Sequence, residues 1–179
     1  MWEKDEKKSH PIWVAREFSK CCGCRRCEIA CSLHHENKIW PEASRVRVFM
    51  LVPGTEFPHL CTQCEDYPCI KTCPFKALDV NEATSAVVVN IEKCTGCGKC
   101  IEACPGKVPF VHPKTNKILI CDLCSGDPQC VKVCQEGGWN CLRMVERGDH
   151  EFKLFSRVPE ETAKALATKL YGEKAEEFF

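Results

Sequence analysis

Apolar residues in the middle of the chain occur in short runs separated by polar turns. Residues 77–80 form one such run, and residues 86–91 form another after a polar stretch. Short apolar segments on both sides of a polar turn are typical of a β-hairpin. We therefore predict two short strands joined by a turn over residues 81–85.

Three other segments have the pattern of strands. Residues 45–49 alternate charged and apolar side chains, and residues 116–120 end in three apolar residues that lead directly into a cysteine. Residues 142–155 have the pattern of a hairpin that turns near Gly148 and Asp149. The chain thus combines several short strands with polar connections.

The last apolar pattern is helical. Pro159 can begin a helix and Gly172 can end it. The apolar side chains between them fall on one helical face, and they are Ala163, Leu166, Ala167, Leu170 and Tyr171. Two interpretations of this face stay open: it packs on the core of the same chain, or it docks on a partner subunit.

Composition excludes some classes of partner. The 179 residues include 25 basic and 25 acidic side chains, so no basic surface for nucleic acid is indicated. No run approaches the roughly 18 apolar residues of a membrane span. The charged N-terminus lacks the apolar segment of a secretory signal. We expect a cytoplasmic location, where thiols stay reduced and free for metal.

Cysteines carry the candidate chemistry. Sixteen of the 18 cysteines form four groups of four. The third group, which Pro105 follows, has the spacing of bacterial ferredoxins. We predict four [4Fe–4S] clusters. In chain order, the ligands of the first to fourth groups are Cys21, Cys24, Cys27 and Cys31; Cys61, Cys64, Cys69 and Cys73; Cys94, Cys97, Cys100 and Cys104; Cys121, Cys124, Cys130 and Cys134.

Other roles for cysteine fit less well. Disulfide scaffolds belong mostly to short secreted chains, and zinc sites usually separate two cysteine pairs by a longer loop. Cys22 and Cys141 lie outside the groups, and we expect them to pack as small apolar side chains. His34 and His35 follow the first group, where we expect a solvated surface turn. No acid–base or nucleophile constellation is evident, so we expect no catalytic residues.

The four groups, in this order, resemble the four-cluster ferredoxin-like subunits of molybdenum and tungsten enzymes of the dimethyl sulfoxide reductase and formate dehydrogenase type. The resemblance covers residues 15–145. Finer motifs at Pro41-x2-Ser44 and at Cys121-Asp122-Leu123-Cys124 look like the soluble iron–sulfur subunits of the aldehyde ferredoxin oxidoreductase class. That class includes the tungsten-containing class II benzoyl-CoA reductases.

The resemblance implies an α+β fold of two nested bacterial-ferredoxin-like halves with a C-terminal hairpin and helix extension. The inner half would contain the second and third groups, and the outer half the first and fourth. Residues 1–144 would form the polycluster domain, and residues 145–179 an extension that could dock on a partner.

The resemblance also implies the pairing of ligands. In each half, the first three cysteines of one group would share a cluster with the last cysteine of the other group. The implied sets are Cys61, Cys64 and Cys69 with Cys104; Cys94, Cys97 and Cys100 with Cys73; Cys21, Cys24 and Cys27 with Cys134; Cys121, Cys124 and Cys130 with Cys31.

Two features depart from the family pattern, and both fall in the outer half. Ser32 and Gln135 follow the last cysteines of the first and fourth groups, where the family has proline. The run Gly137-Gly138-Trp139 after the fourth group is also unusual.

The function implied is that of a non-catalytic electron-transfer subunit. It would relay single electrons between an external partner, such as a ferredoxin or a flavoprotein subunit, and a larger tungsten- or molybdenum-pterin catalytic subunit. The alternative is a free polyferredoxin that diffuses between partners. Trp139, Leu166 and Leu170 are candidate docking residues, because aromatic and aliphatic side chains dominate such contacts.

Overall fold

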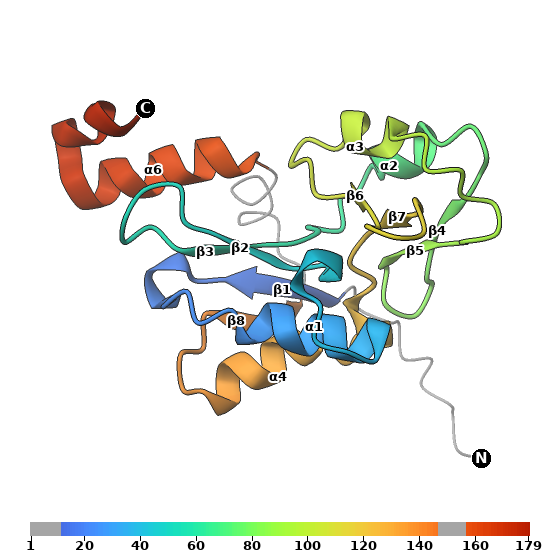
Figure 1. The fold of residues 1–179 in the computed structure, drawn as a ribbon, viewed down its shortest axis with the longest axis horizontal. Coiled ribbons are helices and arrows are strands. Elements are labelled where there is room, and N and C mark those ends of the chain that lie inside the picture. Colours follow the sequence, from blue (N-terminus) through green and yellow to red (C-terminus); the bar gives the residue numbers. More distant parts are fainter. Residues whose placement is uncertain (1–11, 147–156) are drawn as a thin grey trace, which may run out of the picture.

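The computed structural model describes residues 12–146 and 157–179 (Figure 1). Short helices and short strands alternate along the chain, which confirms the expected α+β class at this level. The helices are α1 (Arg26–Glu36), α2 (Pro68–Lys71), α3 (Lys99–Ala103), α4 (Gln129–Glu136) and α6 (Pro159–Tyr171). Four 3-10 segments accompany them: η1 (Phe18–Lys20), η2 (Pro41–Ala43), η3 (Leu123–Gly126) and η4 (Gly172–Phe178).

The strands described pair as antiparallel two-stranded sheets, β1 with β8, β2 with β3, β4 with β5 and β6 with β7. Their bounds are β1 (Ile12–Arg16), β2 (Arg47–Phe49), β3 (Phe57–His59), β4 (Leu78–Val80), β5 (Val87–Val89), β6 (Phe110–Val111), β7 (Ile118–Leu119) and β8 (Leu142–Glu146). No helix in this described part of the chain is long and apolar enough to cross a membrane.

The hairpin predicted between the second and third groups is confirmed as β4 and β5. Leu78 pairs with Val89, and Val80 pairs with Val87. Asn81 shapes the turn, because its side-chain oxygen accepts hydrogen bonds from backbone N–H groups two and three residues later. Local turn chemistry and apolar pattern therefore agree in this segment.

The strand predicted over residues 45–49 is shorter in the structure. The backbone N–H of Arg45 donates to Cys31 Sγ at 3.2 Å instead of to a strand. The Ser44 hydroxyl donates to the Val46 carbonyl at 2.6 Å. Because the Arg45 N–H and the Val46 carbonyl are hydrogen-bonded in this way, β2 begins only at Arg47. The strand predicted over residues 116–120 is likewise reduced to β7.

The segment predicted as a hairpin over residues 142–155 lies only partly within the described residues. Its first strand is present as β8, and the strand beside it is β1, with Val14 opposite Met144. The apolar pattern did not identify β1. This sheet ties the N-terminal part of the chain to the segment that follows the fourth cysteine group.

A helix begins inside each cysteine group, before its last cysteine. Each of α1 to α4 begins one residue before the third cysteine of its group. In three cases the residue before the helix has a positive φ, namely Arg25, Tyr67 and Gly98. A left-handed residue turns the loop sharply, and the helix then separates the third and fourth cysteines by about one turn.

The helices gather in two pairs. α1 packs against α4, and α2 packs against α3. In Figure 1, α1, α4, β1 and β8 lie on one side of the molecule, and α2, α3 and the strands β4 to β7 lie on the other. The first and fourth cysteine groups are therefore neighbours in space, as are the second and third.

Two buried polar side chains connect the two sides. Gln63 is 1% exposed; its Nε2 donates to the Cys121 carbonyl at 2.8 Å, and its Oε1 accepts from the Val87 N–H at 2.9 Å. His59 Nε2 lies 2.8 Å from the Gly106 carbonyl, and burial lowers the pKa of His59 to about 4. The neutral ring can thus donate to that carbonyl.

The predicted C-terminal helix is confirmed as α6, which Gly172 ends. Ala163 and Ala167 are fully buried, and Ala167 packs with Val52. The Tyr171 hydroxyl donates to the Pro53 carbonyl at 2.6 Å. Leu170 is 58% exposed. One edge of the predicted apolar face packs on this chain, and the other edge faces outward.

Gln63→Leu should destabilise the loaded protein. The substitution leaves the Val87 N–H and the Cys121 carbonyl buried without their partner, at a cost of about 1–3 kcal/mol each. We expect the midpoint of thermal bleaching of the visible absorbance to fall by on the order of 10 °C. Gln135→Leu, at an exposed position on α4, is the control and should change it by less than about 2 °C. Equal midpoints for the two variants would contradict this role of Gln63.

Candidate metal centres

Three cysteines of the first group meet the last cysteine of the fourth. Cys21, Cys24 and Cys27 line one hollow of about 350 Å³ together with Cys134. This first-group hollow is partly open to solvent, because Cys24 is exposed whereas Cys27 is buried. The implied outer pairing and the observed neighbours therefore coincide here.

The third group has a similar arrangement. Cys94, Cys97 and Cys100 line a hollow of about 310 Å³ together with Cys73 of the second group. Burial raises the pKa of Cys100 to about 11, and Cys73 contributes to that rise. The Ile118 N–H donates to Cys94 Sγ at 3.5 Å, which ties the hollow to β7.

The second group lies beside the last cysteine of the third group. Burial raises the pKa of the Cys61 thiol; the Gln63 N–H lowers it, and the nearby Cys104 raises it again. The pKa of Cys69 is raised to about 12, first by burial and then by Cys104 and Cys64. Cys104 of the third group is thus one of the neighbours whose charge acts on the thiols of the second group.

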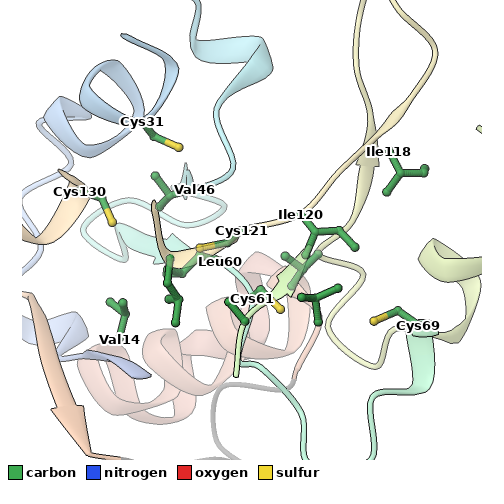
Figure 2. Close-up of a cluster of buried hydrophobic side chains, with 14 of the residues drawn as sticks. Val14, Cys31, Val46, Leu60, Cys61, Cys69, Ile118, Ile120, Cys121 and Cys130 are labelled. Atoms are coloured by element: carbon green, nitrogen blue, oxygen red, sulfur yellow. The ribbon is translucent and has the colours of Figure 1, made fainter. Parts of the chain in front are cut away.

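The fourth group lies beside Cys31. Burial raises the pKa of Cys130 well above its usual range, and Cys31 raises it further. Cys31 also acts on Cys121 and Cys124, again after burial as the main cause. Figure 2 shows Cys31, Cys121 and Cys130 around Val46 in the buried interior. Cys31 of the first group is thus a neighbour whose charge acts on the thiols of the fourth group.

The last cysteine of every group accepts a hydrogen bond from a backbone N–H. Such bonds stabilise a thiolate ligand and raise the potential of the centre that it binds. The pairs are Arg45 N and Cys31 Sγ at 3.2 Å, Ala77 N and Cys73 Sγ at 3.4 Å, Val108 N and Cys104 Sγ at 3.4 Å, and Leu142 N and Cys134 Sγ at 3.5 Å.

The path of the chain to these N–H donors explains why no proline follows the last cysteine of the first and fourth groups. In the second and third groups, Pro74 and Pro105 turn the chain so that the amide four residues after the cysteine donates. In the first and fourth groups, α1 and α4 continue past the last cysteine. A proline in place of Ser32 or Gln135 would lie inside a helix, where it removes a hydrogen bond and clashes with the preceding turn.

Trp139 covers part of the first-group hollow. Its ring belongs to the wall of that hollow, and the Arg26 guanidinium lies 5.7 Å from the ring centroid. A Cβ at position 137 would lie 1.9 Å from the Trp139 ring, so Gly137 provides the space for it. The unusual Gly137-Gly138-Trp139 run thereby has a packing role beside the thiols.

Arg16 is a buried cation among the thiols, which the sequence pattern did not reveal. It is 5% exposed, and its Nη2 donates to the Cys61 carbonyl at 3.4 Å. Burial lowers its pKa to about 10, whereas Cys61, Cys121 and Cys130 raise it. The guanidinium therefore stays positively charged at neutral pH, between the second and fourth groups.

The expected surface turn at His34 and His35 is helical instead, although His34 is exposed as expected. Both residues belong to the last turn of α1. His35 is half-buried, and its Nε2 lies 3.7 Å from Cys124 Sγ and 3.4 Å from Asp122 Oδ1. Burial lowers the pKa of His35. His34, His35 and Cys124 offer ligand atoms within 4.8 Å of one another. Cys124 is itself a candidate cluster ligand of the fourth group.

The expectation that Cys22 and Cys141 are buried spare thiols is confirmed for Cys141 and wrong for Cys22. Both line the first-group hollow. Cys22 is exposed, and Cys141 is buried at 2% exposure. The hydrogen bond between Cys141 and Cys21 lowers the pKa of Cys21 to about 7 and raises that of Cys141. Cys141 is thus a polar contact of a candidate ligand and not merely a small core residue.

The donor sets fit iron–sulfur clusters. Burial disfavours the charged thiolate, and neighbouring thiolates also repel one another, so the pKa values of these thiols rise. A metal centre reverses this effect, because a coordinating thiol is deprotonated outright. Cysteines of two groups line each of two hollows, and backbone N–H groups donate to the sulfur atoms. Sulfur donors with such amide bonds are the environment of an iron–sulfur cluster.

Comparison with known proteins finds relatives that are iron–sulfur proteins. The family described as "4Fe-4S dicluster domain" matches residues 52–144. An aliphatic sulfonate oxidoreductase, polyferredoxin-like subunit, from Pyrococcus furiosus is 49% identical over 170 residues, which cover 94% of this chain and 98% of that protein. The B subunit of polysulfide reductase from Wolinella succinogenes is 39% identical over 130 residues, covering 64% of this chain and 66% of that protein.

A solved structure adds one further match. The active site complex BamBC of benzoyl coenzyme A reductase with benzoyl-CoA matches with a TM-score of 0.45 and 23% identity, over 93% of this chain and 96% of the matched protein. The sequence relatives are named as iron–sulfur or electron-transport subunits and not as catalytic ones, which confirms the expected type of protein. The protein therefore belongs to the 4Fe-4S dicluster family of iron–sulfur electron-transfer proteins.

Proposed function

We propose that the protein binds four [4Fe–4S] clusters and relays single electrons along them. The observation that carries this proposal is the mixing of groups: two hollows are each lined by three cysteines of one group together with the last cysteine of another. A group that bound its cluster alone would have no need of that last cysteine from elsewhere. The mixed sets support all sixteen cysteines as ligands.

The same sets support two nested ferredoxin-like halves. The inner half contains the second and third groups with the β4–β5 hairpin, and the outer half contains the first and fourth groups with the β1–β8 sheet. Residues 1–144 make up the polycluster domain in this proposal. Residues 145–179 are an extension, of which α6 packs beside Val52.

When bound, each cluster takes up and releases one electron. The residues of the chain hold the clusters and set their environment. Burial of Cys61, Cys121 and Cys130 keeps water away from the centres between the two halves. Backbone N–H groups donate to the sulfur atoms of the last cysteine of each group, and they belong to Arg45, Ala77, Val108 and Leu142.

The proposed partner is a larger tungsten- or molybdenum-pterin subunit. The Pyrococcus relative is named as a subunit of an oxidoreductase, and it is similar over nearly its whole length. An external ferredoxin or flavoprotein would supply or accept the electrons. The many free thiols suit a reducing compartment, so we propose the cytoplasm. The alternative is a free polyferredoxin.

Anaerobically purified protein should contain about sixteen irons and about sixteen acid-labile sulfides per chain, as four cubanes require. Iron and sulfide assays with protein quantification by amino-acid analysis measure this directly. A value near twelve would mean that one centre is missing. Stoichiometric zinc with little iron would refute the iron–sulfur assignment for these cysteines.

Arg16→Met should lower the reduction potentials of the centres bound by the second and fourth groups. Loss of a buried positive charge beside these centres disfavours their more negative reduced state, so we expect the potentials to fall by on the order of tens of millivolts. Redox titration followed by paramagnetic resonance measures the shift. Arg143→Met is the control, because Arg143 is exposed and pairs with Glu17 at 3.8 Å. Unchanged potentials in Arg16→Met would contradict the role of this charge.

Leu170→Glu should weaken the complex with the catalytic subunit without reducing the iron content. Leu170 is 58% exposed on α6, and a charge there disfavours an apolar contact. Ile39→Glu, at a position 67% exposed elsewhere, is the matched control. The measurement is tungsten and molybdenum that co-purify with each variant from the native host. A fully loaded wild-type chain that carries neither metal would favour the free polyferredoxin.

A further inference from the structure

His112 connects the two sides of the molecule that Figure 1 shows. It follows β6 directly, and it is buried at 7% exposure. Its Nε2 lies 3.2 Å from Oε2 of Glu36, the last residue of α1 on the other side. The other carboxylate oxygen of Glu36 accepts from Arg45 Nη1 at 2.6 Å. The Arg45 N–H donates to Cys31 Sγ, so a chain of contacts leads from His112 to a candidate ligand.

The hydrogen bonds of the His112 ring fix where its hydrogen lies. Nδ1 accepts from the backbone N–H groups of Lys114 at 3.0 Å and Thr115 at 3.1 Å. A ring nitrogen that accepts carries no hydrogen, so the hydrogen of the neutral ring is on Nε2 and is donated to Glu36. The Trp40 ring packs edge-on against the imidazole, with 5.1 Å between the ring centroids. His112 is therefore an oriented, uncharged donor to Glu36.

The turn after β6 does not by itself require a histidine. Asn81 and Asn90 make the same pair of bonds at two other turns, where each side-chain oxygen accepts from the N–H groups two and three residues later. Asparagine is the ordinary residue for such a turn. What His112 adds is its second ring nitrogen, which extends beyond the turn to Glu36.

The side chain of Arg45 is held at both of its contacts. Its Nη1 donates to Glu36 and also to the Ala43 carbonyl at 2.9 Å, and the side chain is 13% exposed. Burial raises the pKa of Glu36, but hydrogen bonds from Arg45 and His112 outweigh it, so the pKa is lowered and the carboxylate stays ionised at neutral pH. The Arg45 N–H lies 3.2 Å from Cys31 Sγ, the shortest of the four bonds to a last cysteine.

We propose that His112 is a positioning residue for the fourth-group centre: through Glu36 and Arg45 it holds the Arg45 N–H on Cys31 Sγ. The inference rests on the proposed function, since it requires a cluster that Cys31 shares with the fourth group. An N–H that donates to a ligand sulfur raises the potential of the centre. Loss of the bond between His112 and Glu36 should therefore lower the potential of this centre and leave the others unchanged.

Two substitutions of His112 separate this role from its role in the turn. His112→Asn keeps an acceptor for the turn and stays uncharged, but it is too short to donate to Glu36. His112→Gln has a longer amide that can donate to Glu36, but it gives up the turn geometry. His112→Asn should lower the equilibrium constant for reduction of the fourth-group centre by about threefold, which is about 30 mV for one electron. His112→Gln should stay close to the wild-type potential.

The measurement is a redox titration followed by paramagnetic resonance on anaerobically purified full-length variants. The signal of the fourth-group centre is the one that Cys124→Ala removes. Glu36→Gln provides a second test, because it alters the group through which His112 is proposed to act. If the effect passes through Glu36, His112→Asn should shift the potential in the wild-type background and not in the Glu36→Gln background.

Four results would overturn the inference. They are an unchanged potential in His112→Asn, a larger shift in His112→Gln than in His112→Asn, equal shifts by His112→Asn in both backgrounds, and loss of iron from His112→Asn, which would make the residue merely structural. Iron in the wild-type protein separates this failure from that of the proposed function. About sixteen irons with any of these results refute the positioning role alone, whereas little iron refutes the centres and the inference together.

Discussion

The structure depends on the burial of thiols that cannot all be thiolates without metal. Cys61, Cys121 and Cys130 lie in the interior, where burial and neighbouring thiols raise their pKa values. Iron offsets this cost by binding the deprotonated sulfur atoms, and so cluster binding and folding are coupled. The remaining architecture agrees with this view, since most strands have only two or three residues. Such strands are too short to stabilise a domain by themselves.

The crossed arrangement of cysteines gives these short elements their positions. Each set links parts of the chain that are distant in sequence, such as Cys31 on α1 with Cys130 on α4. Gln63 and His59 add hydrogen bonds between the two sides of the molecule. Arg16 offsets part of the negative charge that reduced centres accumulate at the junction. An electron relay needs its centres close together. Negative charges buried close together are costly unless a positive charge such as that of Arg16 lies beside them.

Sequence alone predicted the features with local causes. The β4–β5 hairpin follows from two apolar runs around Asn81, and α6 follows from the spacing between Pro159 and Gly172. Cysteine spacing identified the candidate ligands, and the pairing between groups came from the family resemblance; two of the four pairings correspond to cysteines that line one hollow. Features that depend on tertiary contacts could not be predicted. β1 was missed because its partner β8 is more than a hundred residues away. The contacts of His35 and Cys141 likewise come from segments that meet only on folding.

A crystal structure of the anaerobically purified protein, with iron located by anomalous scattering, tests the central claim most directly. The account predicts four iron centres, each bordered by three cysteines of one group and the last cysteine of its partner group. Cys104 would border the centre of Cys61, Cys64 and Cys69, and Cys31 the centre of the fourth group. Centres bound by four cysteines of a single group, or fewer than four centres in a fully loaded chain, would contradict it.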